Sequence, residues 1–187
     1  MKGMICFMAK SSQKNRKSIK RLNPAKFNIV EATPQDVNRY ITARSRLVYS
    51  YRVIKDKNNT LQIQEAEKKN LEIQKCAREL EPITENSFFS LLEQNVHIFF
   101  LVKDSIDCGF AVVDFEDSTT AYIADLTVFK HLTGMGTLFY NMLENHFRSL
   151  GIAKVHLRAP FDGCKPFWEK MGFTEETNSF SHYHKFF

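Results

Sequence analysis

Two glycines, Gly134 and Gly136, stand in the segment that joins a predicted strand to the clearest amphipathic helix of the chain. Glycines at a helix N-terminus let backbone N–H groups turn outward and approach an anion closely. The helix dipole adds partial positive charge there, so a phosphate or pyrophosphate is the expected ligand. The segment has neither the Lys-Ser/Thr of a Walker A loop nor the third glycine of a dinucleotide fingerprint. By itself it also fits a structural turn.

Metal and disulfide chemistry have little support in the sequence. The chain has four cysteines, Cys6, Cys76, Cys108 and Cys164. They form no C-x-x-C pair and have no histidine at zinc-ligand spacing, so we predict reduced thiols of an intracellular protein and no metal site. His182 and His184 share one face if their segment is a strand, but two imidazoles are too few to indicate a metal centre.

The positive charge is concentrated at the N-terminus. Residues 1–26 contain eight basic residues and no acidic one, whereas the remainder holds 18 basic and 21 acidic residues. The formal net charge of +5 therefore combines a basic tail with a mildly acidic body. We expect residues 1–25 to form a solvated, poorly ordered leader. Contact with nucleic acid or another anionic surface, and a targeting segment, are the alternatives.

The chain as a whole has the composition of a globular domain. Its 187 residues are 43% hydrophobic and 25% charged, which is enough for a sizeable core. The longest apolar run, 98–102, is far shorter than the roughly 20 residues that span a bilayer. An integral membrane protein, a collagen, a disordered chain and a disulfide scaffold are excluded.

The N-terminal half is predicted to be mainly helical. A strand over 27–30 precedes a helix start at Thr33-Pro34, where threonine is the N-cap and an acidic residue follows three positions later. An apolar stripe at spacings of three and four predicts a helix over 63–80. Another short helix is predicted over 87–94.

The C-terminal half switches to strands. Segments 97–103 and 109–115 flank a polar turn and predict an antiparallel hairpin, and 120–128 is a third strand. The amphipathic helix over 139–150 and a strand over 155–158 complete a βαβ unit, so the strands on either side of that helix are expected to be parallel. A short helix over 164–170 and a last strand over 180–187 follow.

Five segments resemble, in the same order, the GNAT superfamily of acyl-CoA-dependent N-acetyltransferases. They are Asn28–Asp36, Asp125–Val128, Gly134–Gly136, Lys154–Arg158 and Phe167–Phe173. The resemblance implies an α/β (α+β) fold with a mixed, mostly antiparallel six- to seven-stranded sheet, a central parallel βαβ unit and flanking helices. We predict one such domain over residues 26–187, behind the tail of residues 1–25.

The resemblance also implies that the glycine segment binds the pyrophosphate of coenzyme A. The family pattern is (Gln/Arg)-x-x-Gly-x-(Gly/Ala), and here His131 replaces the first residue. A second register puts Thr133 at that position and Gly136 at the first glycine. In both registers the amides of residues 132–138 are the donors, and the implied contacts are with His131, Leu132, Thr133, Gly134, Met135, Gly136 and Thr137.

The implied chemistry is attack of an amine on a thioester. Backbone N–H groups near Leu126, Thr127 and Val128 are expected to stabilise the oxyanion and to pair with the pantetheine arm, because parallel strands splay apart at this point in the family. An ammonium with an unperturbed pKa of about 10.4 must first lose its proton. Asp125 and Glu116 are candidate bases by location alone.

The customary general acid of the family, a tyrosine, falls at Trp168, and an indole is no practical acid at neutral pH. The thiolate then leaves unprotonated, or another group such as Tyr122 or Tyr140 serves. Trp168 and Phe167 are also expected against the pantetheine or in the core, and transfer through Cys164 is a minor alternative. The residues expected to line the acceptor site are Tyr49, Tyr51, Phe88, Phe89, Tyr122, His182 and Tyr183.

The sequence therefore predicts a cytoplasmic N-acetyltransferase that uses acetyl-CoA as co-substrate, needs no metal and acts on a small-molecule or peptide amine. Membrane binding is not expected, nucleic acid is expected only through the basic tail, and a homodimer is compatible with the sequence. Two alternatives stay open. One is a non-catalytic acyl-CoA-binding or sensing domain, and the other is an acyltransferase that acts on a protein or a charged RNA.

Overall fold

The computed structural model describes residues 22–44, 85–129, 134–159, 164–177 and 181–187. One compact unit consists of the described residues up to Ala32 together with Gln94–Phe187, and a second unit lies within Thr33–Glu93. The predicted helix over 63–80 and nearly all of the basic tail lie outside the described residues. The single domain over 26–187 therefore stays a prediction.

Seven described strands form one mixed sheet in the order β1-β2-β3-β4-β5-β7-β6. Their bounds are β1 Phe27–Glu31, β2 Val96–Lys103, β3 Ile106–Phe115, β4 Thr120–Val128, β5 Lys154–Arg158, β6 Thr174–Glu175 and β7 His182–Phe186. Among the described strands only β4 and β5 are parallel neighbours, and every other pair is antiparallel. The predicted mixed sheet with a parallel βαβ unit is confirmed.

The hairpin of β2 and β3 is tighter than the sequence predicts. The sequence predicts a four-residue polar turn, whereas β2 continues to Lys103 and β3 begins at Ile106. The two residues between them, Asp104 and Ser105, have φ values of 48° and 63°. Positive φ at both central positions is the geometry of a two-residue hairpin turn, because it matches the twist of the strands.

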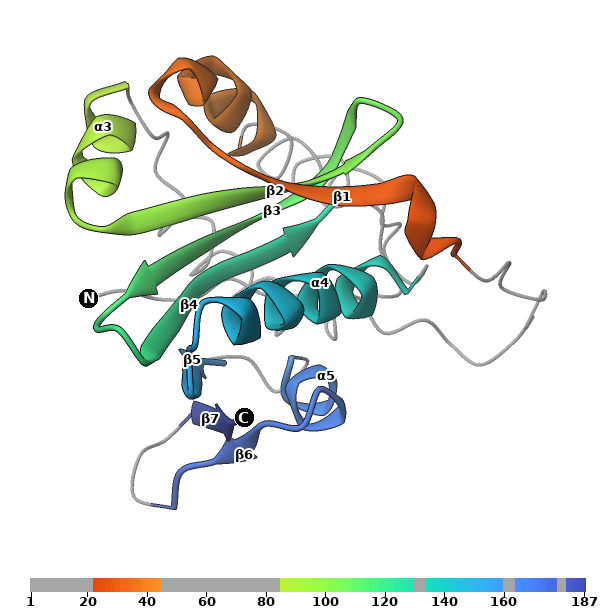
Figure 1. Cartoon of the computed structure of the whole chain (residues 1–187), viewed down its shortest axis with the longest axis vertical. Coiled ribbons are helices and arrows are strands. Elements are labelled where there is room, and N and C mark those ends of the chain that lie inside the picture. Colours follow the sequence, from red (N-terminus) through yellow and green to blue (C-terminus); the bar gives the residue numbers. More distant parts are fainter. Residues whose placement is uncertain (1–21, 45–84, 130–133, 160–163, 178–180) are drawn as a thin grey trace, which may run out of the picture. The chain divides into compact units, whose positions relative to one another are not determined.

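Helix α4, Met135–Ser149, crosses from β4 to β5 and covers one face of the sheet (Figure 1). Its stripe of Phe139, Leu143 and Phe147 is completely buried in one core with apolar side chains of the strands. This is the amphipathic helix that the 3.6-residue period predicts. It begins directly after Gly134, which caps it in the left-handed conformation at φ 81°.

The described part of the second unit contains only helical elements. A 3-10 turn η2, Pro34–Asp36, leads into helical residues 37–44, and α3, Glu85–Glu93, precedes β2. The Thr33 N–H and Oγ1 both donate to the Asp36 carboxylate, at 2.9 and 2.8 Å. The predicted helix start at Thr33-Pro34 is therefore present. A short 3-10 turn η1, Pro24–Lys26, precedes β1 in the first unit.

Strands β3 and β4 approach each other unusually closely at Gly109. A Cβ atom added to Gly109 would lie 2.3 Å from the Thr127 carbonyl oxygen and 3.1 Å from the Val128 Cα. Both obstacles are backbone atoms of β4, which cannot turn away as a side chain can. A glycine inside a strand often marks such a close backbone approach.

We expect Gly109→Ala to destabilise the protein by about 2–3 kcal/mol, since the added methyl forces β3 and β4 apart. Denaturant unfolding monitored by circular dichroism measures this loss. Gly151→Ala is the control: Gly151 has φ 79° with no atom within 4 Å of the added Cβ. It should cost only the left-handed backbone, about 1 kcal/mol. Equal losses in the two variants would contradict the close-contact explanation.

Candidate functional site

The parallel strands β4 and β5 separate halfway along β4. Their pairing runs from Thr120 opposite Lys154 to Ile123 opposite Leu157, whereas β4 stays paired with β3 as far as Val128. On its other edge β5 is paired with β7 along its whole length, from Lys154 opposite Phe186 to Arg158 opposite His182. The edge of β4 that faced β5 is therefore left without a neighbouring strand from residue 124 onward among the described residues.

A β-bulge in β4 coincides with this separation. Val112 of β3 lies opposite Asp125, but Val113 lies opposite Ile123, so Ala124 has no partner of its own. An extra residue of this kind bends the strand and increases its twist. The bulge thus supplies the local reason why β4 turns away from β5.

The hydrogen-bond direction along β4 identifies its open amides. The Phe129 N–H donates to the Cys108 carbonyl at 2.8 Å, toward β3. Because N–H groups alternate between the two edges of a strand, those of Leu126 and Val128 point away from β3, to the edge that β5 has left. Two backbone donors are available there for an extended ligand or an oxyanion.

The N-terminus of α4 lies in the same βα connection. The first hydrogen bond of the helical ladder runs from the Leu138 N–H to the Gly134 carbonyl at 3.0 Å. The N–H groups of Met135, Gly136 and Thr137 consequently lack acceptors in the helix. The first turn contains no acidic residue, so nothing in it opposes an anion. His131, Leu132 and Thr133 lie outside the described residues.

Asp125 is a buried carboxylate beside the open amides. It is 5% exposed, and its Oδ1 accepts a hydrogen bond of 2.9 Å from the hydroxyl of Thr127, which is also buried. Leu126 and Val128 belong to the core that contains α4. Alternation along the strand therefore turns Asp125 and Thr127 to the sheet face away from α4.

Trp168 is completely buried in the core rather than exposed in a cleft. It lies in α5, Lys165–Lys170, and its ring contacts those of Tyr140, Phe167 and Phe173 at centroid distances of 5.7, 4.8 and 5.1 Å. Its indole nitrogen has no hydrogen-bond partner among the described residues. These contacts give Trp168 a packing role, and its predicted contact with coenzyme A stays a prediction.

The other predicted acids and bases differ in how close they lie to the open edge of β4. Tyr140 is completely buried beside Trp168, and burial raises the pKa of its phenol. Tyr122 is on β4 itself, and burial raises the pKa of its phenol as well. The Glu116 N–H bonds to the Thr120 carbonyl at 3.1 Å. Glu116 is thus near the start of β4, about 20 Å along the strand from Leu126.

The carboxylate of Glu116 contacts a histidine of β5, so it is directed away from the open edge of β4. Its Oε2 lies 2.8 Å from the His156 Nε2, on the β5 side of the hairpin.

Cys164 is 1% exposed, so its thiol is part of the core. Across the described part of the chain, no group of three or more metal-ligating side chains gathers, and no helix is long and apolar enough to cross a membrane.

A charged cluster fastens the C-terminal end of α4 to β7. The Lys185 ammonium donates to Glu144 Oε2 at 2.6 Å and to the Met171 carbonyl at 2.8 Å, while Arg148 donates to Glu144 Oε1 at 2.9 Å. Partial burial raises the pKa of Glu144, but the hydrogen bonds from Lys185 and Arg148 outweigh it and hold the pKa below its usual value. The helix that carries the open amides is thereby held at its far end.

Comparison with known proteins supports the fold through structure alone. No protein-family model matches the sequence, and no curated protein matches it significantly. Solved structures do match. The PaiA N-acetyltransferase from Thermoplasma acidophilum, solved with coenzyme A, has 17% identity and a TM-score of 0.54 over 86% of this chain and 99% of that one.

Two further structures show the same likeness. The ribosomal-protein-S18-alanine N-acetyltransferase from Escherichia coli has 15% identity and a TM-score of 0.54, over 84% of this chain and 89% of that one. A GNAT-family acetyltransferase from Staphylococcus aureus has 13% identity and a TM-score of 0.56, over 86% and 98%. The chain therefore has the fold of the GNAT acetyltransferases, as the sequence motifs predict.

Some features of the site have only a weak signal in the sequence. Gly109 within a strand pattern is the recognisable one, because such a glycine often indicates a bulge or a close approach. The bulge at Ala124 and the pairing of Arg158 with His182 have no local signature. Both depend on which strands become neighbours.

We predict that Glu144→Gln lowers the free energy of unfolding at pH 7 by about 1 kcal/mol, because the charged hydrogen bonds of Lys185 and Arg148 lose their anion. Since folding depresses the pKa of Glu144, its contribution is present above its ordinary pKa and disappears as the pH falls through the lower folded value. Urea unfolding of both proteins from pH 7 to pH 3 should show the difference shrink toward zero. A difference independent of pH would contradict the assignment.

Proposed function

We propose that the protein is an N-acetyltransferase that moves an acetyl group from acetyl-CoA to a primary amine by direct transfer. The observation that carries this proposal is the separation of β4 from β5 beside the N-terminus of α4. It leaves strand amides and helix amides free in one βα connection. Neighbours of the same fold solved with coenzyme A or with acetyl-CoA support the choice of co-substrate.

In this proposal the N-terminus of α4 binds the pyrophosphate. The amides of Gly134, Met135, Gly136 and Thr137 are the described donors, and the segment 131–133 completes the loop. Partial positive charge at the helix start favours the two phosphate charges. A side chain at Gly134 would need the left-handed backbone that glycine alone adopts cheaply.

The open edge of β4 then takes the pantetheine arm and the thioester. The N–H groups of Leu126 and Val128 are free to pair with the pantetheine amides, as an added strand would. One of them faces the oxyanion of the tetrahedral intermediate, where a donor stabilises developing charge more than it stabilises the thioester. Thr127, between them, turns its side chain to Asp125.

Asp125 is the proposed proton acceptor for the attacking ammonium. It is a buried carboxylate next to the oxyanion donors, and its Thr127 hydrogen bond fixes its orientation. The amine must reach the carbonyl carbon as a free base, so a carboxylate close to the nitrogen or one water away assists. The proposal places the reaction in the cytoplasm, where the free thiols of Cys108 and Cys164 stay reduced.

Trp168 supports a second candidate function. At the position where the family pattern has a tyrosine, this chain has a buried indole, which cannot protonate the departing thiolate. A domain that binds acyl-CoA without turnover would have no need of that acid. The acetyltransferase hypothesis requires the thiolate to leave without a proton from α5. A screen of amines that measures thiol release distinguishes the enzyme from the non-catalytic domain.

We expect acetyl-CoA to bind with a Kd of about micromolar and Gly134→Glu to weaken binding at least about tenfold, because the new carboxylate opposes the pyrophosphate. Isothermal titration calorimetry measures both values. Gly151→Glu is a matched control, since Gly151 also has positive φ but lies at the other end of α4. Its Kd should equal that of the wild type. No binding by the folded wild type would refute the proposed function.

We expect Asp125→Asn to lower kcat at least about a hundredfold on the best amine while the Kd for acetyl-CoA changes little, because an amide cannot accept the proton. Steady-state thiol release and calorimetry give the two numbers. Thr127→Val, which removes the hydrogen bond but keeps the carboxylate, should lower kcat less. An unchanged kcat in Asp125→Asn would exclude Asp125 as the base.

A further inference from the structure

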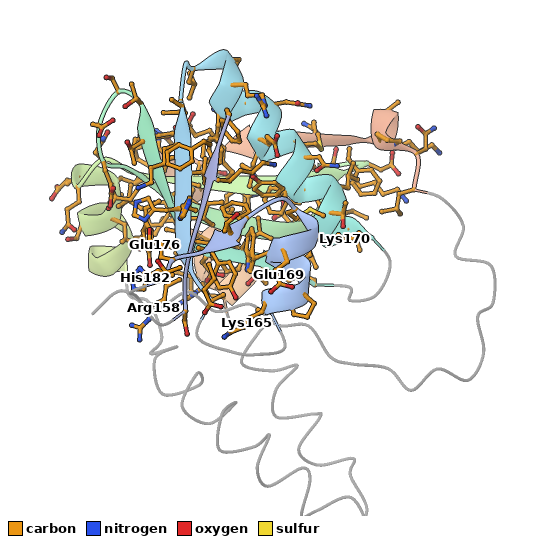
Figure 2. All side chains as sticks on the ribbon, turned by 90° about the horizontal axis from the view of Figure 1, so that it is seen from below. Arg158, Lys165, Glu169, Lys170, Glu176 and His182 are labelled. Carbon is orange, nitrogen blue, oxygen red and sulfur yellow. The ribbon has the colours of Figure 1, made fainter. Side chains whose placement is uncertain are left out.

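Two side chains that carry N–H groups, those of Arg158 and His182, lie side by side at the end of β5, beyond its last pair with β4. Arg158 is the last residue of β5, and His182, the first of β7, is its cross-strand partner. Figure 2 shows both at the same end of the sheet. They share one face because directly opposite residues of an antiparallel pair do so.

Neither side chain has a hydrogen-bond or ion-pair partner among the described residues, and the Arg158 Nε is buried without an acceptor. The neighbouring charges are already paired. Lys165 lies 3.3 Å from Glu175, and His184 lies 3.6 Å from Glu176. Among the described residues the guanidinium therefore has no anion as a partner, and a buried donor without an acceptor is destabilising.

The pair stands on the same face of the sheet as the proposed base. The Tyr122 ring contacts that of His156 at 5.0 Å, and His156 is two residues before Arg158 on β5. The charge of Arg158 acts on the Tyr122 phenol, where it opposes the rise in pKa that burial causes. Asp125 also points away from α4, so Arg158 and Asp125 lie on the acceptor side of the opening.

We propose that Arg158, with His182 beside it, binds a carboxylate of the amine acceptor, so that the substrates are amines carrying a carboxylate a few bonds from the nitrogen. A guanidinium presents two parallel N–H groups that match the two oxygens of a carboxylate. The Leu126 amide lies three residues past the last β4–β5 pair, about 10 Å along the strand. That spacing suits a short acceptor. This inference rests on the proposed function.

The test compares amines that differ only in the anion. Glycine, β-alanine, 4-aminobutyrate, glutamate and a short peptide are each assayed beside the corresponding carboxamide, with acetyl-CoA and thiol detection. The wild type should favour at least one carboxylate over its amide by about tenfold to a hundredfold in kcat/KM. Arg158→Gln should bring that ratio to about one, through KM.

Two variants separate a specific contact from a general effect of charge. Lys154→Gln removes a cation from the same strand and face, but at the other end of β5, where Lys154 lies opposite Phe186. This variant should keep the preference for carboxylates over carboxamides. Arg158→Lys retains the charge without the planar fork and should keep part of it. Thermal unfolding of each variant shows that it is folded.

Several outcomes would overturn the inference. Equal kcat/KM for carboxylates and amides, a preference for amines with a phosphonate, or loss of the preference in Lys154→Gln would each do so. Weaker acetyl-CoA binding by Arg158→Gln would assign the arginine to coenzyme A instead. If no amine reacts, calorimetric titration of the CoA-bound protein with the same pairs decides, and equal or absent affinity overturns it. Acetyl-CoA binding itself fails only if the proposed function fails.

Discussion

The site depends on one requirement of backbone chemistry, which is that strand N–H and C=O groups need hydrogen-bond partners. Along β4 one edge is satisfied by β3 throughout, whereas the other is satisfied by β5 only as far as Ile123. The bulge at Ala124 turns the strand away and leaves the Leu126 and Val128 amides at an open edge. A polar ligand that offers carbonyl groups in an extended conformation completes this edge as a further strand would. In the proposed function, binding and oxyanion stabilisation use the same two donors.

The packing around the opening keeps it from closing. Helix α4 buries a continuous aromatic and aliphatic stripe against β2–β5, and the ion pairs of Glu144 hold its far end to β7. The Trp168 ring of α5 packs edge-on against the Tyr140 ring of α4. On the other side of β4, Gly109 allows β3 to approach so closely that an added Cβ would lie 2.3 Å from the Thr127 carbonyl oxygen. The opening between β4 and β5 is thus bordered by packed core residues on the α4 side.

The charge of the chain is unevenly distributed between its N-terminal 26 residues and the remainder. The basic tail accounts for the positive net charge, whereas the folded body is mildly acidic, so binding of anions by the body relies on local groups. In our proposals, these are the helix amides of α4 for the pyrophosphate and Arg158, which has no ion-pair partner among the described residues, for the acceptor. Trp168 marks where this chain departs from the family pattern: an indole stands in place of the tyrosine that the resemblance implies as the acid, so in the proposed mechanism the thiolate leaves without a proton from this position.

Local patterns in the sequence were sufficient for the elements that form the proposed coenzyme A site. Alternation over 120–128, the glycines at 134 and 136 and the 3.6-residue period after them predict strand, turn and helix, because each signal depends on residues close in the chain. Contacts between distant residues were decided only by the tertiary structure. The bulge at Ala124 follows from the register with β3, the burial of Trp168 from the meeting of α4 and α5, and the pairing of Arg158 with His182 from the strand order β5-β7-β6. Register and strand order set such contacts, and neither leaves a periodic trace in a single sequence.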